Sequence, residues 1–246
     1  MFSVRITAAT ARRVLIQLRN DHQTIALILG LPALELTLLR FVLDSAPEVY
    51  DRWAVPLLGV FPLISMFLVT SVAMLRERTS GTLERLLTTP LNKLDLLVGY
   101  GLAFSLAAVV QATVTCAVAY GLLGLDSPGS PWLVVLIAVA DALLGVALGL
   151  FTSAFARTEF QAVQFMPAVV IPQLLLCGLV WPRDQMATIL QRISDVLPMT
   201  YAYQALHEVT RHAHATSALW RNLGVVLAAA VVALLLGAAT LRRQTP

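Results

Sequence analysis

The chain has 246 residues, of which 58% are hydrophobic and only 13% are charged, with a formal net charge of +3. A water-soluble domain has about 45–50% apolar and about 25% charged residues, so this composition excludes a protein whose whole surface faces water. The apolar residues form blocks of about 20, the length that crosses a bilayer core of about 30 Å as a helix. A membrane β-barrel would instead show alternating segments of about 10 residues, so an all-α integral membrane protein is predicted.

Residues 1–24 are expected to precede the first membrane span as an N-terminal interfacial segment. Arg5, Arg12, Arg13 and Arg19 interrupt this segment, and four apolar residues lie between positions 14 and 18. No continuous apolar stretch of a cleavable signal peptide is present. The pattern is compatible with a helix at the membrane surface or with a solvated segment before the first span.

Six apolar blocks predict a six-helix transmembrane bundle. They are Ile25–Leu43, Val55–Leu75, Leu94–Gly124, Trp132–Phe155, Phe160–Val180 and Leu219–Leu241. The third block is longer than a single crossing needs, which is compatible with a surface turn at its beginning. An even number of spans places both ends of the chain on the same side of the membrane.

The distribution of basic residues predicts that both termini are cytoplasmic. Six of the 17 basic residues would lie on the other side: Arg40, Arg52, Arg183, Arg192, Arg211 and Arg221. The remaining eleven would be cytoplasmic, in agreement with the positive-inside rule. All four tryptophans fall at predicted outer ends of the spans, where an aromatic belt is expected.

Two acidic residues lie near the middle of predicted spans, Glu35 in the first and Asp141 in the fourth. An ionisable side chain at this depth costs about 2.5–3.5 kcal/mol on insertion scales, so it usually faces the protein interior or a cavity. Asp141 shares a helical face with Gly145, Gly149 and Ser153, which is typical of close helix packing. Asp141 is interpreted first as a packing residue, and both acidic residues remain candidates for a substrate path.

The segment 76–93 connects the second and third spans on the predicted cytoplasmic side. Leu83, Leu86 and Leu87 recur at helical spacing, and Pro90 ends the pattern. This predicts a short amphipathic helix at the membrane surface, with an ordinary charged loop as the alternative.

The segment 181–218 is the only long connection on the opposite side. In its first part apolar residues recur at helical spacing, at Met186, Ile189, Leu190, Ile193 and Leu197. This pattern predicts an amphipathic helix that buries its apolar side against the spans and ends at Pro198.

The sequence offers no catalytic motif. A phosphate-binding loop requires a lysine after glycine, but the single lysine, Lys93, lies between Asn92 and Leu94. His207 and His212 are five residues apart, whereas a zinc-protease helix needs a spacing of four. No enzyme activity, bound cofactor or metal site is therefore expected, and any ATP would have to be hydrolysed by a partner.

The connection between the second and third spans resembles that of the ABC-2 type transporter permeases. The resemblance rests on Glu77-Arg78, the run from Gly81 to Leu87, and Thr89-Pro90. In that family the loop forms a coupling helix that docks on the nucleotide-binding subunit. The resemblance assigns coupling to Glu77, Gly81, Thr82, Leu83, Glu84, Arg85 and Leu87. Thr79-Ser80 departs mildly from the usual residues before the glycine.

A second similarity lies before the last span. Leu197-Pro198-Met199-Thr200-Tyr201 resembles the family's NPLTY element, with leucine in place of asparagine. In the family this region forms short re-entrant helices that cover the exit of the substrate path. The resemblance therefore implies an extracytoplasmic gate at Pro198, Thr200 and Tyr201, with an ordinary surface loop as the alternative.

The resemblance implies that residues 1–246 form a single ABC-2 type transmembrane domain in a bacterial cytoplasmic membrane. Its expected partners are an ABC ATPase subunit, which would bind ATP and Mg²⁺, a second identical or paralogous permease, and membrane lipid; no nucleic acid is expected. The expected function is efflux of a hydrophobic or amphipathic drug or natural product. Export of a lipid or polysaccharide is an alternative, as is a non-transporting scaffold or immunity protein.

Overall fold

The computed structural model describes residues 3–79 and 93–240, and within these ranges all regular structure is helical. The elements are α1 (Val4–Asn20), α2 (His22–Val42), α3 (Pro47–Thr79), α5 (Lys93–Gly121), α6 (Pro131–Ser153), α7 (Glu159–Leu176), the 3₁₀ turn η1 (Arg183–Gln185), α8 (Thr188–Ser194), α9 (Pro198–Arg211) and α10 (Ser217–Thr240). Six of them, α2, α3, α5, α6, α7 and α10, are long and apolar enough to cross a membrane. This confirms the predicted number of spans.

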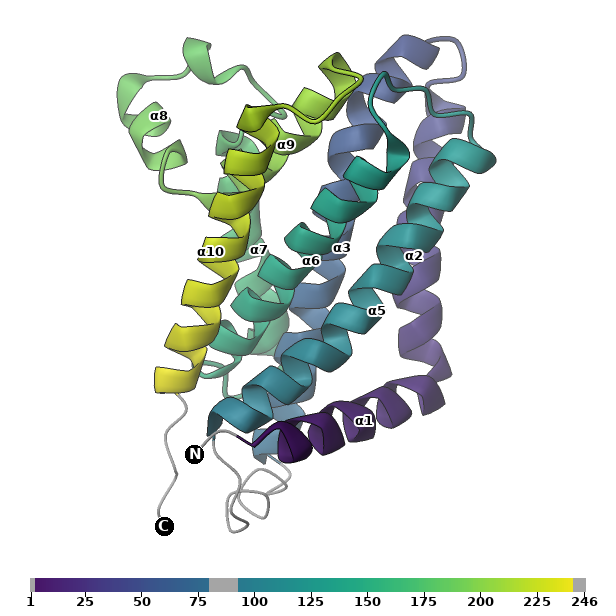
Figure 1. The fold of residues 1–246 in the computed structure, drawn as a ribbon. Helices are drawn as coiled ribbons and strands as arrows, with labels where there is room; N and C mark the ends of the chain where they lie inside the picture. The colour runs from purple at the N-terminus through teal and green to yellow at the C-terminus, as the bar shows by residue number, and fades with distance from the viewer. Residues whose placement is uncertain (1–2, 80–92, 241–246) are drawn as a thin grey trace.

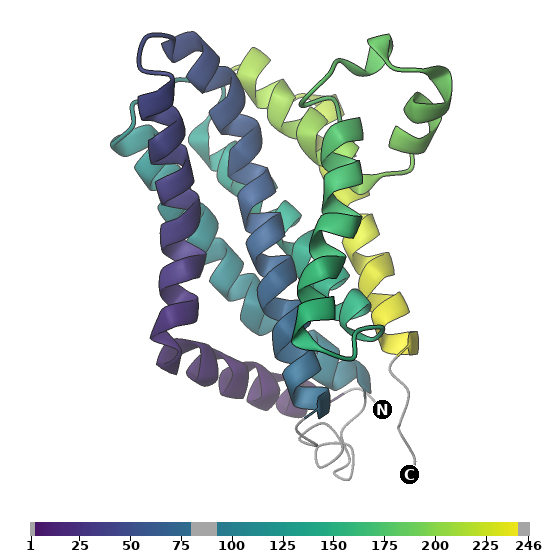
Figure 2. The ribbon, with the colours of Figure 1, turned by 180° about the vertical axis from the view of Figure 1, so that it is seen from behind.

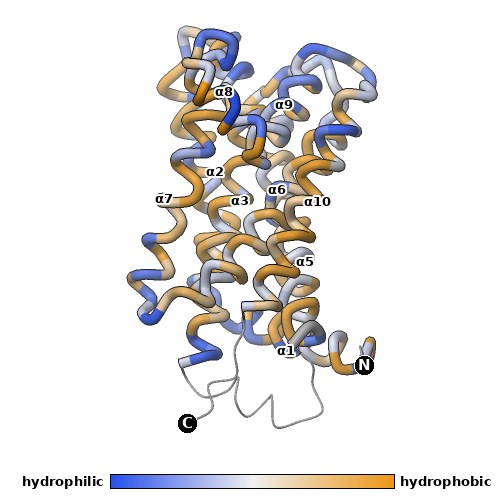
Figure 3. Tube along the Cα trace, turned by 90° about the vertical axis from the view of Figure 1, so that its left-hand side faces the viewer, coloured by the Kyte–Doolittle hydropathy of each residue, from blue (hydrophilic) through white to orange (hydrophobic). Residues whose placement is uncertain are grey.

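The six long helices form a bundle with different elements at its two ends (Figure 1). Helix α1 lies across one end, here named the α1 end, and α8 and α9 lie at the opposite end, here named the α8 end. Apolar residues dominate the middle of the long helices, whereas polar residues gather near the connections (Figure 3). The last turn of α10 lies at the same end of the bundle as α1 (Figure 1).

Helix α1 packs directly on the beginning of α5. Thr7, Thr10 and Val14 form its buried side. A Cβ atom placed on Gly99 of α5 would lie 2.7 Å from the Cβ of Thr10, so only a glycine allows the two helices to approach this closely. The backbone N–H of Ser3 also donates to Oδ1 of Asp95, at 3.0 Å.

Two predicted span boundaries need correction. Helix α3 begins at Pro47 rather than near Val55, because proline is favoured in the first helical turn and Tyr50 in the added turns is buried, with 1% exposed. Because these added turns contain charged residues, they do not belong to the apolar run that predicted the span. The third span has no surface turn at its beginning, since α5 is a continuous helix from Lys93 to Gly121.

Helix α6 forms the centre of the bundle, between α3 and α10 (Figures 1 and 2). Its small residues form the close helix contact that their shared face predicted, and the partner helix is α3. A Cβ atom on Gly149 would be 2.5 Å from the carbonyl oxygen of Phe67, and one on Gly145 would overlap the carbonyl oxygen of Leu63. Ser153, the last member of this face, is fully buried. The backbone of α6 at these two glycines therefore packs directly on the backbone of α3, the usual role of small residues between membrane helices.

Candidate functional site

Glu77 lies in the last turn of α3, next to the connection that sequence similarity assigns to coupling. Its Oε1 atom pairs with Nη1 of Arg13 on α1, at 3.2 Å. Nη2 of Arg13 donates to the hydroxyl of Tyr100 on α5, at 3.0 Å, and the guanidinium lies 5.9 Å from the centre of that ring. These three side chains, here named the Arg13 cluster, join α1, α3 and α5.

The Arg13 cluster is partly shielded from solvent. Only 12% of the Glu77 side chain and 31% of the Arg13 side chain are exposed. A charged pair at this depth interacts more strongly than a pair in water, and loss of one member leaves the other with an uncompensated charge. The cluster is therefore a structural tie rather than an incidental surface contact.

The residues on either side of Glu77 make two further connections. Arg76 forms two hydrogen bonds to the carboxylate of Glu159 at the beginning of α7, at 2.7 and 3.1 Å. Arg78 donates to the carbonyl oxygen of Ser153 at the end of α6. Three consecutive residues of α3 thus connect it with α1, α5, α6 and α7, so a displacement of this end of α3 would reach most of the bundle.

The other residues assigned to coupling lie outside the described part of the chain. They are Gly81, Thr82, Leu83, Glu84, Arg85 and Leu87. Sequence reasoning missed Arg13 and Tyr100, which are far from Glu77 along the chain. The only available signal was the concentration of arginines before the first span.

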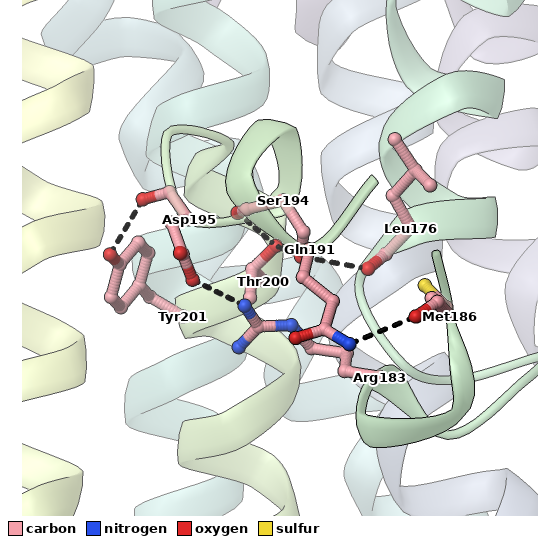
Figure 4. Close-up of polar contacts among 8 residues, drawn as sticks. All are labelled: Leu176, Arg183, Met186, Gln191, Ser194, Asp195, Thr200 and Tyr201. Atoms are coloured by element: carbon pink, nitrogen blue, oxygen red, sulfur yellow. Dashed lines mark hydrogen bonds and ion pairs between the residues drawn. The ribbon is translucent and has the colours of Figure 1, made fainter. Parts of the chain in front are cut away.

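At the α8 end, the three residues assigned to a gate lie at the beginning of α9. Pro198 is its first residue, where a missing N–H costs nothing. The hydroxyl of Thr200, which is fully buried, donates to the carbonyl oxygen of Ser194 at 2.8 Å. The hydroxyl of Tyr201 donates to the carbonyl oxygen of Asp195 at 2.7 Å (Figure 4).

These contacts belong to a polar network that joins α7, α8 and α9, shown in Figure 4. The hydroxyl of Ser194 donates to the carbonyl oxygen of Leu176 at 2.8 Å and lies 3.0 Å from the Thr200 hydroxyl. Arg183 pairs with the carboxylate of Asp195. Leu197, which replaces the asparagine of the family element, precedes α9 without a side-chain cap. The network therefore holds this turn through Ser194 and Thr200.

The prediction of an amphipathic helix around Ile189 is wrong about the length of the helix and about which of its sides is buried. Helix α8 has only seven residues, Thr188–Ser194, and follows a 3₁₀ turn. Ile189 is 70% exposed and Ile193 is 45% exposed in the described chain. The side that faces the bundle is instead Ser194, which is fully buried because its hydroxyl takes part in the polar network.

Glu35 and Asp141 occupy different environments. Glu35 is half-buried on α2, the span that lies at the edge of the bundle with many exposed leucines. Asp141 of α6 is only 2% exposed. It lies next to Gly59 of α3, where an added Cβ atom would overlap the Oδ2 atom of Asp141 and the side chain of Leu206 on α9. Its Oδ1 atom has no hydrogen-bond partner among the described residues. Helix packing alone does not explain such a carboxyl group, since a buried polar atom without a partner is costly.

Two histidines near the end of α9, His207 and His212, contact neighbouring aromatic and acidic side chains. The His207 ring stacks on Tyr203, with the ring centres 5.6 Å apart. Burial lowers the pKa of His207, and the charges of Arg211 and Arg52 lower it further. Glu208 accepts a hydrogen bond from Thr216 at 2.7 Å and lies 3.4 Å from Nδ1 of His212. Within residues 3–79 and 93–240, His, Cys, Asp and Glu side chains do not gather into a group of three suited to a metal ion.

Comparison with known proteins places this architecture in a family. The family model described as ABC-2 type transporter matches residues 5–210. The probable multidrug ABC transporter permease YbhR of Escherichia coli (strain K12) is 27% identical over 179 residues, which cover 72% of this chain and 49% of that protein. The linearmycin resistance permease protein LnrN of Bacillus subtilis (strain 168) is 27% identical over 168 residues, covering 68% of this chain and 43% of that protein.

A eukaryotic protein shows the same similarity over a shorter stretch. ABC transporter G family member 20 of Dictyostelium discoideum is 30% identical over 141 residues, which cover 57% of this chain and 19% of that protein. The chain thus spans about half or less of the length of these relatives. Since the family model covers most of the residues, from the first turn of α1 to the last turn of α9, the chain belongs to the ABC-2 type transporter family.

Proposed function

We propose that the chain is the permease subunit of an ATP-driven exporter that moves a hydrophobic or amphipathic compound out of the cell. A separate ABC ATPase subunit would bind ATP and Mg²⁺, and a second permease, identical or paralogous, would complete the transport path. Relatives named as multidrug and linearmycin resistance permeases support a drug or natural product as the substrate class. The observation that carries the proposal is the set of ties from Arg76, Glu77 and Arg78 to four other helices.

These ties suit the transmission of motion from an ATPase. Force applied to the connection after Thr79 would act on the end of α3 first. Arg76 and Arg78 hold α7 and α6, and the Arg13 cluster holds α1 and α5. Rigid elements joined by polar contacts can transmit such a displacement to a distant end, where the polar network around Thr200 would respond.

The test is reconstitution with the ATPase subunit in lipid vesicles. The expected result is ATP-dependent accumulation of a drug in inside-out vesicles, with no accumulation when the ATPase carries an inactive phosphate-binding loop. If the two proteins associate and hydrolyse ATP without moving any of a panel of drugs, lipids and oligosaccharides, the chain is a scaffold and the transport proposal is wrong.

We propose further that the α1 end faces the cytoplasm of a bacterial cell and that the α8 end faces outward. In a variant without Cys116 and Cys177, cysteine at the exposed Ser217 is expected to react with a membrane-impermeant maleimide on intact cells. Cysteine at the exposed Arg5 in α1 is the matched control and should react only after lysis. The reverse pattern would show that the orientation is wrong.

The polar network of α8 and α9 is proposed as the outer gate, and Thr200→Val tests it. Valine has nearly the shape of threonine but leaves the buried carbonyl oxygen of Ser194 without this donor, which costs about 1–3 kcal/mol. We expect a lower melting temperature of the purified protein and a faster passive leak of drug from loaded vesicles. Thr113→Val is the control, because the Thr113 hydroxyl is exposed and bonds only within α5. A stable variant without increased leak would leave Thr200 with no part in gating.

A further inference from the structure

A cavity of about 570 Å³ lies at the α1 end, lined by α1, α2, α3 and α5. Helices α2 and α3 diverge toward this end, and α1 crosses beneath them (Figure 2). The size falls within the range of about 300–1,000 Å³ that is typical of small-molecule sites. Leu27, one of the lining residues, is 63% exposed, so the cavity is open at α2.

The lining changes from apolar to charged along the helix axes. On α3 it extends from Leu68 to Glu77, and its apolar part on this helix is Leu68, Val69, Val72 and Ala73. Arg76 and Glu77 lie at the α1 end of the same helix, about 12–14 Å from Leu68 at 1.5 Å per residue. Asp21, between α1 and α2, lines the charged part as well. A ligand with an apolar body and a polar head, oriented as in the adjacent membrane leaflet, matches this gradient.

The charges of the lining favour a cationic head. Arg76 is bonded to Glu159, and Glu77 is paired with Arg13, so each of these charges is compensated by a residue outside the cavity. Asp21 accepts hydrogen bonds from the N–H of Thr24 at 3.0 Å and from its hydroxyl at 2.6 Å. No basic side chain of the described residues lies within 4.0 Å of a carboxylate oxygen of Asp21. Arg76, which lines the same cavity, acts on Asp21 through its charge from a longer distance, but the Arg76 guanidinium is already bonded to Glu159. These hydrogen bonds lower the pKa of Asp21, so its carboxylate is charged at neutral pH.

We propose that this cavity binds a lipophilic cation taken from the adjacent membrane leaflet, with its apolar body against Val69 and Ala73 and its positive charge beside Asp21. The inference rests on the proposed function, because the bound cation would be cargo held before transport. Phe104 and Tyr100, whose ring already lies beside the Arg13 guanidinium, complete the apolar part of the wall.

The test uses the permease alone in nanodiscs of zwitterionic lipid, without ATPase or nucleotide. Radiolabelled tetraphenylphosphonium is the probe, and tetraphenylborate, an anion of nearly the same shape, is the comparison in equilibrium dialysis against empty nanodiscs. We expect one saturable site per chain for the cation, with at least tenfold weaker binding of the anion.

Two variants locate the site. Asp21→Asn keeps a side chain that can cap α2 but removes the charge, and should weaken cation binding by up to about fivefold, the upper range for one exposed ion pair. Ala73→Phe fills the apolar part and should abolish saturable binding. The controls are Asp44→Asn and Ala228→Phe, at exposed positions outside the cavity, and both should bind as the unmodified chain does.

The outcomes separate this inference from the transport proposal. Equal binding of the anion and the cation, or binding unaffected by Asp21→Asn, would overturn the cation site even if ATP-driven transport is intact. Saturable cation binding that depends on Asp21, without coupled transport, would support the site and overturn the transport proposal. Melting curves of each variant show whether a loss of binding reflects unfolding, and Asp21→Asn decides the question if Ala73→Phe does not fold.

Discussion

Replacement of Gly145 by leucine is expected to prevent the bundle from forming, or to lower its stability by about 3 kcal/mol or more. A side chain at this position overlaps the carbonyl oxygen of Leu63 on α3, and the carbonyl carbon and Cα of Leu63 lie within 3.0 Å of the new Cβ. Because these are backbone atoms, the clash is relieved only by separating α3 from α6, at or above the upper range for overpacking. The measurements are the yield of monodisperse protein after size-exclusion chromatography and its melting temperature.

Gly101→Leu in α5 is the matched control for this variant. A Cβ atom at Gly101 meets no other atom within 4 Å, so leucine there fits in open space. Leucine also has a better helix propensity than glycine, so the control should be as stable as the unmodified chain or slightly more stable. If both leucine variants behave alike, close contact between α3 and α6 is not what stabilises the centre of the bundle.

The second large effect is expected from reversal of one charge in the Arg13 cluster. Glu77→Arg would place two guanidinium groups together in a partly shielded site, where Arg13 now pairs with the carboxylate. Repulsion would separate α1 from the end of α3, and we expect at least a tenfold loss of ATP-driven transport, equal to about 1.4 kcal/mol in the barrier. Transport and ATP hydrolysis by the reconstituted complex are measured together, since failed coupling lowers transport more than hydrolysis.

A charge swap and a second ion pair provide the controls. The double variant Arg13→Glu with Glu77→Arg restores opposite charges and should recover part of the transport that either single variant loses. Glu159→Ala removes the partner of Arg76 at the same end of the bundle, but both side chains are more than half exposed, so an effect below about 1 kcal/mol is expected. Equal losses from Glu77→Arg and Glu159→Ala would argue against a special role for the Arg13 cluster.

The predicted fold and the described structure agree most closely where a pattern is local. The small residues of α6 recur along one helical face, so Gly145, Gly149 and Ser153 could be assigned to an interface before the partner helix was known. Helical spacing was a weaker guide around Ile189. That apolar pattern indicated burial, but the polar contacts of Ser194 determine which side of α8 faces the bundle.

The candidate sites were predictable only in part. Similarity in the sequence selected Glu77, Thr200 and Tyr201 as candidates, but it could not select the residues that contact them. Arg13 contacts Glu77 across 64 positions of the chain, and no local spacing encodes that contact. Asp21 appeared as one polar residue before a span, and its relation to the cavity depends on how α2 diverges from α3.

The sequence by itself determined that this chain inserts into a membrane as six helices, because each span must supply its own apolar length and its own backbone hydrogen bonds. Each segment meets these requirements by itself, so they are visible in its own amino-acid composition. The tertiary structure alone decided which polar side chains meet at the two ends of the bundle. Such contacts join helices that are distant along the chain, and their partners are selected by the packing of α3 against α6 and of α1 against α5.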